Sequence, residues 1–234
     1  MRAVLLAGGM GVRLRPLTYT IPKPLLPVGE RPILEEIIER LKAFDIDEYI
    51  ITVGYRAELI ETYFRNGAQL GVKIDYVHET QPLGTAGALS LVRGMRDLPD
   101  DEPLYVMNGD ILTDLDVHAL MDAHRRGGHD MTIATVEFEL QHPYGVLRVT
   151  DGEVTGIMEK PTVTDTVSTG MYAIQPSALS LIPEEKYFDM PDLVNALLAE
   201  RRSVGAWPFH GEWLAIQRME QLDEASRMLA ERRA

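Results

Sequence analysis

The earliest residues with the types and spacing for chemistry form a glycine-rich run close to the N-terminus. The run Leu6–Arg13, LAGGMGVR, places three glycines and an arginine directly after a short apolar stretch. Glycines let backbone N–H groups approach phosphate oxygens because no Cβ intervenes. The forked guanidinium of Arg13 also suits a phosphate. The run therefore predicts an anion site, against the alternative that it is only a flexible turn.

Two familiar phosphate-binding motifs do not fit this run. A dinucleotide fingerprint needs a third glycine where Leu14 stands, and a Walker loop needs a Gly-Lys pair, which the chain nowhere contains. The charge pattern still favours an anion. Residues 1–29 hold Arg2, Arg13, Arg15 and Lys23 and no acidic residue, in a chain whose net charge is −13. That overall charge argues against a general nucleic-acid binder, which needs basic phosphate contacts.

Two further candidates lie beyond the glycines. Prolines 22, 24 and 27 restrict the backbone around Lys23, so its ammonium suits a second phosphate group, although a solvent-facing lysine is the plainer alternative. Asp110 follows Asn108-Gly109 at the end of an apolar run. Its carboxylate suits a magnesium ion, or it only caps the next turn.

These residues need a scaffold that brings distant segments together, and the hydrophobic pattern predicts an α/β sheet. Short apolar runs predict strands, and apolar residues at helical spacing predict helices between them. The expected strands are 2–7, 49–53, 73–78 and 104–107, and the expected helices are 32–41, 57–66 and 85–95. Strands and helices that alternate in this way indicate a mainly parallel sheet, with ligands at the carboxyl ends of its strands.

The second half of the chain has a different pattern. Strands are expected at 131–137, 145–149, 154–159 and 168–174, with a tight turn at Asp151-Gly152, followed by helices over 192–200 and 219–230. We therefore expect a single domain over 1–234. Its sheet would be Rossmann-like, mixed but mainly parallel and flanked by helices, with a strand-rich second half.

Composition excludes other classes of site. The chain contains no cysteine, so disulfides, thiolate zinc sites and cysteine nucleophiles are absent. A cysteine-free chain suits a reducing cytoplasm, which is the expected location. No stretch approaches the about eighteen apolar residues of a membrane span.

The motifs taken together resemble the sugar-1-phosphate nucleotidyltransferases, also called nucleotide-sugar pyrophosphorylases. The most specific part is the pair LAGGMGVRLRPLT and PKPLLPVG near the N-terminus. Further segments agree in order: residues 81–89 (QPLGTAGAL), 108–110 (NGD), 144–146 (YGV), 159–161 (EKP) and 169–172 (TGMY). The resemblance extends from residue 1 to about residue 230. It implies a nucleotide-binding half over about 1–125 and a sugar-phosphate-binding half over about 126–234.

The resemblance implies a reaction and roles for four catalytic residues. Members of the family join a nucleoside triphosphate to a sugar 1-phosphate and release pyrophosphate. Arg13 would neutralise the leaving end of the triphosphate, Lys23 the reacting phosphates and Lys160 the sugar phosphate, while Asp110 would hold Mg²⁺. The partners would be an NTP and a sugar 1-phosphate, with no nucleic acid and no membrane. Relatives often form dimers or tetramers, so a homo-oligomer stays open.

The resemblance also implies two sets of binding residues. The nucleotide set is Leu6, Ala7, Gly8, Gly9, Gly11, Val12, Arg13, Gln81, Pro82, Gly84, Thr85, Asn108 and Asp110. The sugar set is Gly109, Tyr144, Gly145, Glu159, Lys160, Thr169 and Gly170. The sequence of residues 82–89 is similar to the corresponding segment of mannose-1-phosphate and heptose-1-phosphate guanylyltransferases. This similarity favours GTP and a mannose- or heptose-type sugar.

Two departures from the family pattern leave alternatives open. Val12 stands where the family usually has Thr or Ser, and Ala215 and Gln217 occupy the places where it has a second metal-binding aspartate. Gln217 could supply a neutral oxygen in its place, Glu212 is a nearby carboxylate, and the phosphates of the nucleotide could also keep the ion in place. The chain is thus expected to be a guanylyltransferase, or a uridylyl- or thymidylyltransferase of the same family, or a catalytically weak relative that binds nucleotide in a regulatory role. An unrelated cytidylyl- or molybdopterin-type transferase fits the later motifs poorly.

Overall fold

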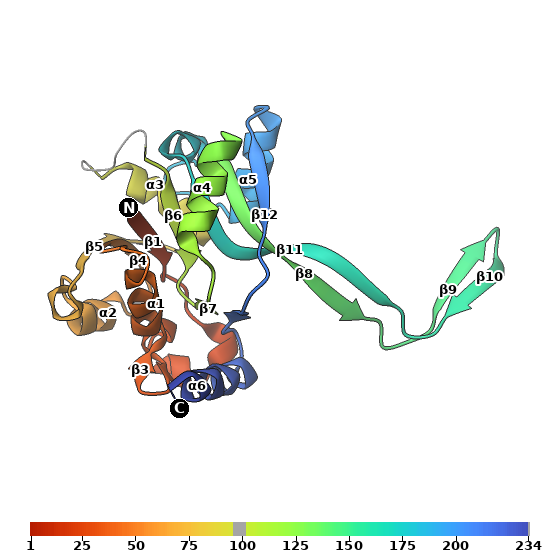
Figure 1. The fold of residues 1–234 in the computed structure, drawn as a ribbon, viewed down its shortest axis with the longest axis horizontal. Coiled ribbons are helices and arrows are strands. Elements are labelled where there is room, and N and C mark those ends of the chain that lie inside the picture. Colours follow the sequence, from red (N-terminus) through yellow and green to blue (C-terminus); the bar gives the residue numbers. More distant parts are fainter. Residues whose placement is uncertain (96–101, 234) are drawn as a thin grey trace.

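A seven-stranded sheet forms the centre of the molecule in a computed structural model that describes residues 1–95 and 102–233 (Figure 1). The strand order is β12-β8-β11-β6-β1-β4-β5. In chain order these strands are β1 (Arg2–Leu6), β4 (Glu48–Val53), β5 (Lys73–His78), β6 (Leu104–Asn108), β8 (Met131–Gln141), β11 (Thr162–Ile174) and β12 (Val204–Pro208). Only β11 runs antiparallel to its neighbours, β6 and β8. The prediction of a mixed, mainly parallel sheet is confirmed.

Helices cover both faces of this sheet, because successive strand residues point to opposite sides. Ala3 and Leu5 of β1 pack in one core with α1 (Ile33–Lys42), α2 (Ala57–Phe64) and α4 (Val117–Gly127). Val4 packs in the other core with α3 (Gly84–Arg93) and α5 (Met190–Ala199). The C-terminal helix α6 (Met219–Arg233) adds Leu222 to the first core. No helix in the described part of the chain is long and apolar enough to cross a membrane.

Several short elements were not expected from the sequence. The edge strand β12 is one, and two small sheets are others: β2 (Pro27–Val28) with β3 (Arg31–Pro32), and β7 (Ile111–Thr113) with β13 (Trp213–Ala215). Within residues 1–95 and 102–233, five 3₁₀ helices connect larger elements: Val12–Leu14, Leu17–Tyr19, Lys23–Leu25, Ala68–Leu70 and Pro176–Leu181. The helix expected over 57–66 ends at Phe64, because Arg65 already has a positive φ of 51°.

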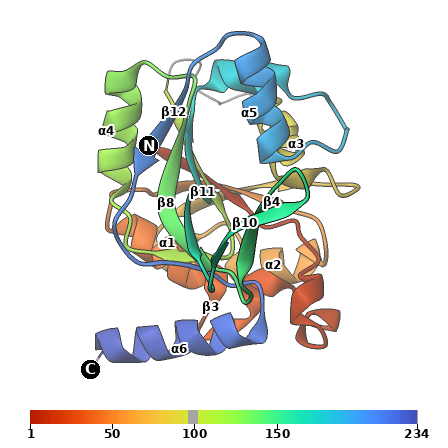
Figure 2. The same cartoon turned by 90° about the vertical axis from the view of Figure 1, so that its right-hand side faces the viewer.

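The outer parts of β8 and β11 leave the body of the molecule together (Figures 1 and 2). Both strands are longer than the sequence predicts, and beyond them β9 (Val146–Thr150) and β10 (Glu153–Met158) form a hairpin. The expected turn at Asp151-Gly152 closes that hairpin, with positive φ at both residues. We call residues 137–166 the arm. Every arm residue is exposed except Gly156 and Pro161, which are half-buried.

Candidate active site at the carboxyl ends of the strands

The glycine-rich run leaves β1 at the carboxyl edge of the sheet, where backbone hydrogen bonds hold it to the neighbouring strands. The Ala7 N–H donates to the Thr52 carbonyl at 3.0 Å, and the Gly109 N–H donates to the Leu6 carbonyl at 2.8 Å. A Cβ at Gly109 would lie 2.8 Å from that same carbonyl, so only glycine fits there. The hydrogen bond between Gly109 and Leu6 thus joins the end of β1 to the Asn108–Asp110 turn that follows β6.

A cavity of about 470 Å³ opens beside this junction and gathers most of the predicted nucleotide set. Its lining includes Leu6, Ala7, Gly8, Gly9, Gly11, Pro82, Gly84, Thr85, Asn108 and Asp110, together with Lys23 and Gly109. Three predicted residues do not line it. Val12 is exposed, Gln81 donates to the Glu185 carbonyl instead, and Arg13 stands just outside.

Lys23 and Asp110 form an ion pair at the wall of this cavity, although 87 residues separate them. Both side chains are largely buried, at 15% and 20% exposed. Lys23 begins a 3₁₀ helix after Pro22, which fixes its backbone as expected. Nearby, Arg13 Nη1 donates to Gln217 Oε1 at 2.5 Å. Two cations, one carboxylate and one amide therefore meet where the sequence placed an anion and metal site.

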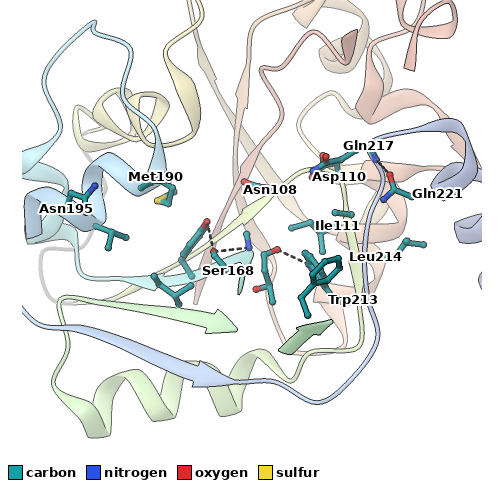
Figure 3. Close-up of a pocket in the computed structure, with 18 residues that line it drawn as sticks. Asn108, Asp110, Ile111, Ser168, Met190, Asn195, Trp213, Leu214, Gln217 and Gln221 are labelled. Atoms are coloured by element: carbon teal, nitrogen blue, oxygen red, sulfur yellow. Dashed lines mark hydrogen bonds between the residues drawn. The ribbon is translucent and has the colours of Figure 1, made fainter. Parts of the chain in front are cut away.

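A second cavity, of about 880 Å³, adjoins the first and shares three of its walls, Asn108, Asp110 and Gln217 (Figure 3). Thr169 and Gly170 of the predicted sugar set line it. Gly170 has a φ of 81°, and a Cβ there would lie 2.5 Å from Asn108 Nδ2, so glycine is required. The Trp213 indole donates to the Thr169 carbonyl at 2.8 Å. Among the described residues that line this cavity, Asp110 is the only charged one.

Comparison with known proteins now fixes the family. A nucleotidyl transferase family model matches residues 2–232. The chain belongs to the nucleotidyl transferase family. It is 37% identical over 92% of its length to the mannose-1-phosphate guanylyltransferase catalytic subunit beta of Drosophila pseudoobscura pseudoobscura, of which it spans 58%. It is 34% identical over 97% of its length to the UTP–glucose-1-phosphate uridylyltransferase of Synechocystis sp., of which it spans 63%.

Solved structures share the fold of this chain. HddC from Yersinia pseudotuberculosis matches with a TM-score of 0.76 and 25% identity, over 97% of this chain and 99% of that one. A UDP-glucose pyrophosphorylase complexed with UDP-glucose matches with a TM-score of 0.75 and 21% identity, over 99% and 98% of the two chains. The resemblance drawn from the motifs is confirmed for the family. The named relatives differ in nucleotide and in sugar.

Within this nucleotidyl transferase, sequence reasoning missed Glu79, which lines the smaller cavity. Glu79 Oε2 accepts a hydrogen bond from the Leu83 N–H at 3.2 Å, and its carboxylate lies close against Gly8. Burial raises the pKa of Glu79, which the Leu83 N–H and the Thr52 hydroxyl partly oppose. A signal was available, because Glu79 directly follows a predicted strand at the edge where ligands bind.

The helix that follows Glu79 is held by a capping residue of another helix. Asp189 caps the N-terminus of α5, and its Oδ1 also accepts from the Thr85 N–H at 3.0 Å. The Thr85 hydroxyl accepts in turn from the Met190 N–H at 2.8 Å. Thr85 and Asp189 both line the smaller cavity, together with Tyr187. The sequence therefore fixes one wall of that cavity by joining the starts of α3 and α5.

The segment with the missing aspartate lies against Asp110. Ala215 of β13 pairs with Ile111, and the Ile216 N–H donates to the Asp110 carbonyl at 2.8 Å. Gln217 lines both cavities, whereas the Glu212 carboxylate pairs with Arg232 and lines neither. Of the two oxygen donors considered from the sequence, only Gln217 lies at the site. Among the described residues, no three His, Cys, Asp or Glu side chains cluster as metal ligands.

Four predicted sugar-binding residues lie elsewhere. Tyr144, Gly145, Glu159 and Lys160 are on the arm and line neither cavity. Two of them are neighbours, because a Cβ at Gly145 would lie 3.0 Å from Glu159 Oε2. The structure thus divides the predicted sugar set into Gly109, Thr169 and Gly170 at the cavities and these four on the arm.

Proposed function

We propose that the chain transfers a nucleotidyl group from a nucleoside triphosphate to a sugar 1-phosphate. The main support for this proposal is the pair of adjoining cavities that meet at Asp110, with Lys23 at their junction. The smaller cavity would bind the nucleotide against the glycine-rich run. The larger would bind the sugar. The two reacting phosphates would then meet at the shared wall.

The proposed step is an in-line displacement at the α-phosphorus. An oxygen of the sugar phosphate forms a bond to that phosphorus, the bond between the α-phosphorus and its bridging oxygen breaks, and pyrophosphate leaves with the electron pair. The attacking phosphate is already an anion, so no general base is required. The protein must instead position crowded phosphates and neutralise their charge. Lys23 would neutralise the reacting phosphates, and Arg13 the leaving pyrophosphate.

The residues present fit a magnesium ion. Mg²⁺ usually takes one or two carboxylates together with substrate phosphates. Asp110 would supply the carboxylate, and the amide oxygen of Gln217 stands at the same wall. Bound Mg²⁺ would add positive charge at the reacting phosphates. Lys23 now holds the Asp110 carboxylate, so an incoming phosphate would have to draw the lysine away.

Glu79 supports guanine as the base. Its carboxylate is a pure hydrogen-bond acceptor beside Gly8 in the smaller cavity. Guanine presents two adjacent donors, N1–H and the N2 amino group, which one carboxylate can accept together. Uracil and thymine present a single donor between two acceptors. The likeness to a mannose-1-phosphate guanylyltransferase supports the same choice and favours a mannose- or heptose-type sugar.

One observation favours a second candidate function. Ala215 leaves the metal site without a second carboxylate, which suits a relative that binds nucleotide or nucleotide sugar but turns over poorly. The retained Lys23, Asp110 and Arg13 support the enzyme over this regulatory alternative.

The deciding experiment is pyrophosphate release with Mg²⁺. GTP, UTP, CTP, dTTP and ATP would each be paired with mannose, glucose and manno-heptose 1-phosphates. Release with one pairing supports the enzyme and fixes base and sugar together, and GTP is the expected base. Nucleotide binding without release in any pairing would favour the regulatory function.

A further inference from the structure

The turn between β4 and α2, residues 54–56, supports the glycine-rich run from outside the smaller cavity. The Tyr55 N–H donates to the Gly8 carbonyl at 3.3 Å. A Cβ at Gly54 would lie 3.0 Å from that carbonyl oxygen, so the turn and the run are in close contact. Gly8, Gly9 and Gly11 line the smaller cavity, whereas the residues of the turn line neither cavity. The turn therefore contacts the run from behind.

A buried threonine ties the other end of the run to the same turn. Thr18 is 1% exposed, and its hydroxyl donates to the Gly11 carbonyl at 2.8 Å. The Thr18 carbonyl in turn accepts from the Tyr55 hydroxyl at 3.0 Å. A Cβ at Gly11 would lie 2.9 Å from Thr18 Cγ2, so these two segments are also in close contact. Tyr55 thus reaches Gly8 directly and Gly11 through Thr18.

Arg56 fixes the direction in which the Tyr55 hydroxyl donates. Arg56 Nε donates to that hydroxyl at 3.1 Å, and Arg56 Nη2 donates to the Tyr19 carbonyl at 2.8 Å. The Tyr55 hydroxyl also lies 3.3 Å from the Tyr19 carbonyl, but this acceptor already receives the bond from the guanidinium. A hydroxyl that accepts from a cation is polarised and donates more strongly. The proton of Tyr55 is therefore directed to the Thr18 carbonyl.

The two tied carbonyls set the direction of the N–H groups that follow them. The peptide bonds of the run are trans, and in a trans peptide the carbonyl and the next N–H point to opposite sides. The carbonyls of Gly8 and Gly11 face the turn and the threonine, so the N–H groups of Gly9 and Val12 point away from them. Within residues 1–95 and 102–233 neither N–H donates a hydrogen bond. Both are available to a phosphate oxygen.

A glycine-rich run needs an external restraint to keep this orientation. Glycine lets the backbone approach a phosphate because it has no Cβ, but the same freedom lets a peptide unit turn over. A peptide unit that turned over would present its carbonyl oxygen to the phosphates in place of an N–H, and the two negative partners would repel. Three glycines lie within residues 8–11. The restraint therefore has to come from residues around the run.

We propose that Thr18, Tyr55 and Arg56, which we call the clamp, are positioning residues for the triphosphate. They hold the carbonyls of Gly8 and Gly11 away from the cavity, so the run meets the phosphates in its binding orientation. The clamp acts through the run, because none of its three residues lines either of the two cavities. The phosphates are those of the proposed function, on which this role rests. Preorganisation of this kind lowers the cost of binding.

Two substitutions remove hydroxyls of the clamp while nearly keeping the shape of each side chain. Thr18→Val and Tyr55→Phe should each lower the GTP affinity measured by calorimetry about five- to tenfold, as for one lost hydrogen bond. Guanosine has the base and the ribose but no phosphate, so its affinity, measured by competition with GTP, should hardly change. An equal loss for guanosine and GTP would overturn the proposal. Unchanged GTP affinity in both variants would also overturn it.

Matched controls make the same chemical changes elsewhere. Thr62→Val and Tyr63→Phe each delete a hydroxyl that donates on the exposed surface of α2, and both should keep the wild-type affinity for GTP. Thr18→Ser retains the donor to Gly11 and should keep it as well. A loss in these three variants as large as in Thr18→Val would overturn the proposal, since the effect would not depend on the clamp.

Kinetics separate positioning from a loss of folded protein. Thr18→Val and Tyr55→Phe should raise KM for GTP and leave kcat close to the wild-type value, because the bound triphosphate reorders the run. A fall in kcat with an unchanged KM would indicate a smaller folded fraction and overturn the role. The double variant should lose little more affinity than either single one, because both hydroxyls belong to one relay. Losses that add in full would break the relay into independent contacts and overturn it.

The orientation of the run can also be tested without any ligand. In ¹⁵N NMR spectra of the free protein, the amide signals of Gly9 and Val12 should shift in Tyr55→Phe and in Thr18→Val, and stay in place in Thr62→Val. A wild-type chain that binds no nucleoside triphosphate refutes the proposed function, and these spectra then decide the clamp. Unchanged signals overturn it. Should Tyr55→Phe fail to fold, Thr18→Val carries the same test.

Discussion

The two ends of the proposed sugar site are held in different ways. Lys23, Asp110 and the glycine-rich run are fixed within the body by strand ends, backbone hydrogen bonds and a shared ion pair. Lys160 and Glu159 lie on a two-stranded ribbon with little around them. The residues of the body are packed within the chain, whereas those of the arm are exposed. Under the proposed function, the body carries the residues for the nucleotide, and the arm carries part of the set that the family resemblance assigns to the sugar.

The largest expected effect comes from a substitution in the body of the molecule, at Lys23. Lys23→Ala removes the cation at the junction of the two cavities, and turnover should fall about 10²–10³-fold, as for other lost charge-stabilising groups. The thermal unfolding midpoint should change little. Lys73→Ala, whose lysine makes only an exposed ion pair with Asp75, is the matched control. Near-normal turnover in Lys23→Ala would remove this lysine from the mechanism.

The second largest effect is expected when most of the arm is removed. Phe138 pairs with Asp165, so residues 139–164 can be replaced by an Asn-Gly turn that keeps the ladder below it. The shortened chain should bind GTP with unchanged affinity by calorimetry, because the smaller cavity is untouched. Its turnover should fall about 100-fold or more, since the sugar phosphate loses its positioning. A shortened chain that lost GTP affinity would contradict the division between body and arm.

The sequence could predict the body because its signals are local. Strands β1, β4 and β6 are apolar runs buried on both faces, and the residues after them meet at one edge whatever the details of packing. That rule placed the glycine-rich run beside Asp110. It did not extend to Val12, Arg13 and Gln81, which do not line the cavity that their neighbours line.

The arm could not be predicted because nothing local ends its strands. Beyond Glu137 the side chains still alternate in β8, yet no body residues cover them. The edge strand β12 was missed for a related reason, since its residues, VGAWP, include a glycine and a proline that weaken the strand pattern. The distance between Lys160 and the cavities follows from the course of these outer strands, which no local sequence pattern contains.

A third variant tests whether Glu79, in the body, recognises the base of the nucleotide. Glu79→Gln keeps the size of the side chain but replaces one acceptor oxygen with a donor, which faces the donors of guanine. The preference for GTP over UTP should fall about tenfold, within the range for losing a hydrogen bond to a charged group. The ratio of kcat/KM for GTP to kcat/KM for UTP, compared between the variant and the wild type, measures this change in preference. An unchanged preference would place base recognition elsewhere.

Glu79 also predicts a pH dependence. Guanine donors need the ionised carboxylate, and burial raises the pKa of Glu79 above its usual value. GTP affinity should therefore fall, as the pH is lowered, at a higher pH than an ordinary glutamate would give. In Glu79→Gln this fall should disappear. Persistence of the same titration in the variant would assign it to another group.

The smallest expected effect concerns the metal site. Ala215→Asp places a carboxylate beside Asp110, on the β13 strand that pairs with β7. The Mg²⁺ concentration for half-maximal turnover should fall about threefold, a small fraction of the about 4 kcal/mol that two charges gain at 4 Å near a protein surface. Thr113→Asp, on the partner strand away from both cavities, is the control for added charge. If only Ala215→Asp tightens the titration, the site is a depleted metal site; if neither does, Asp110 and the substrate phosphates hold the ion without help from this strand.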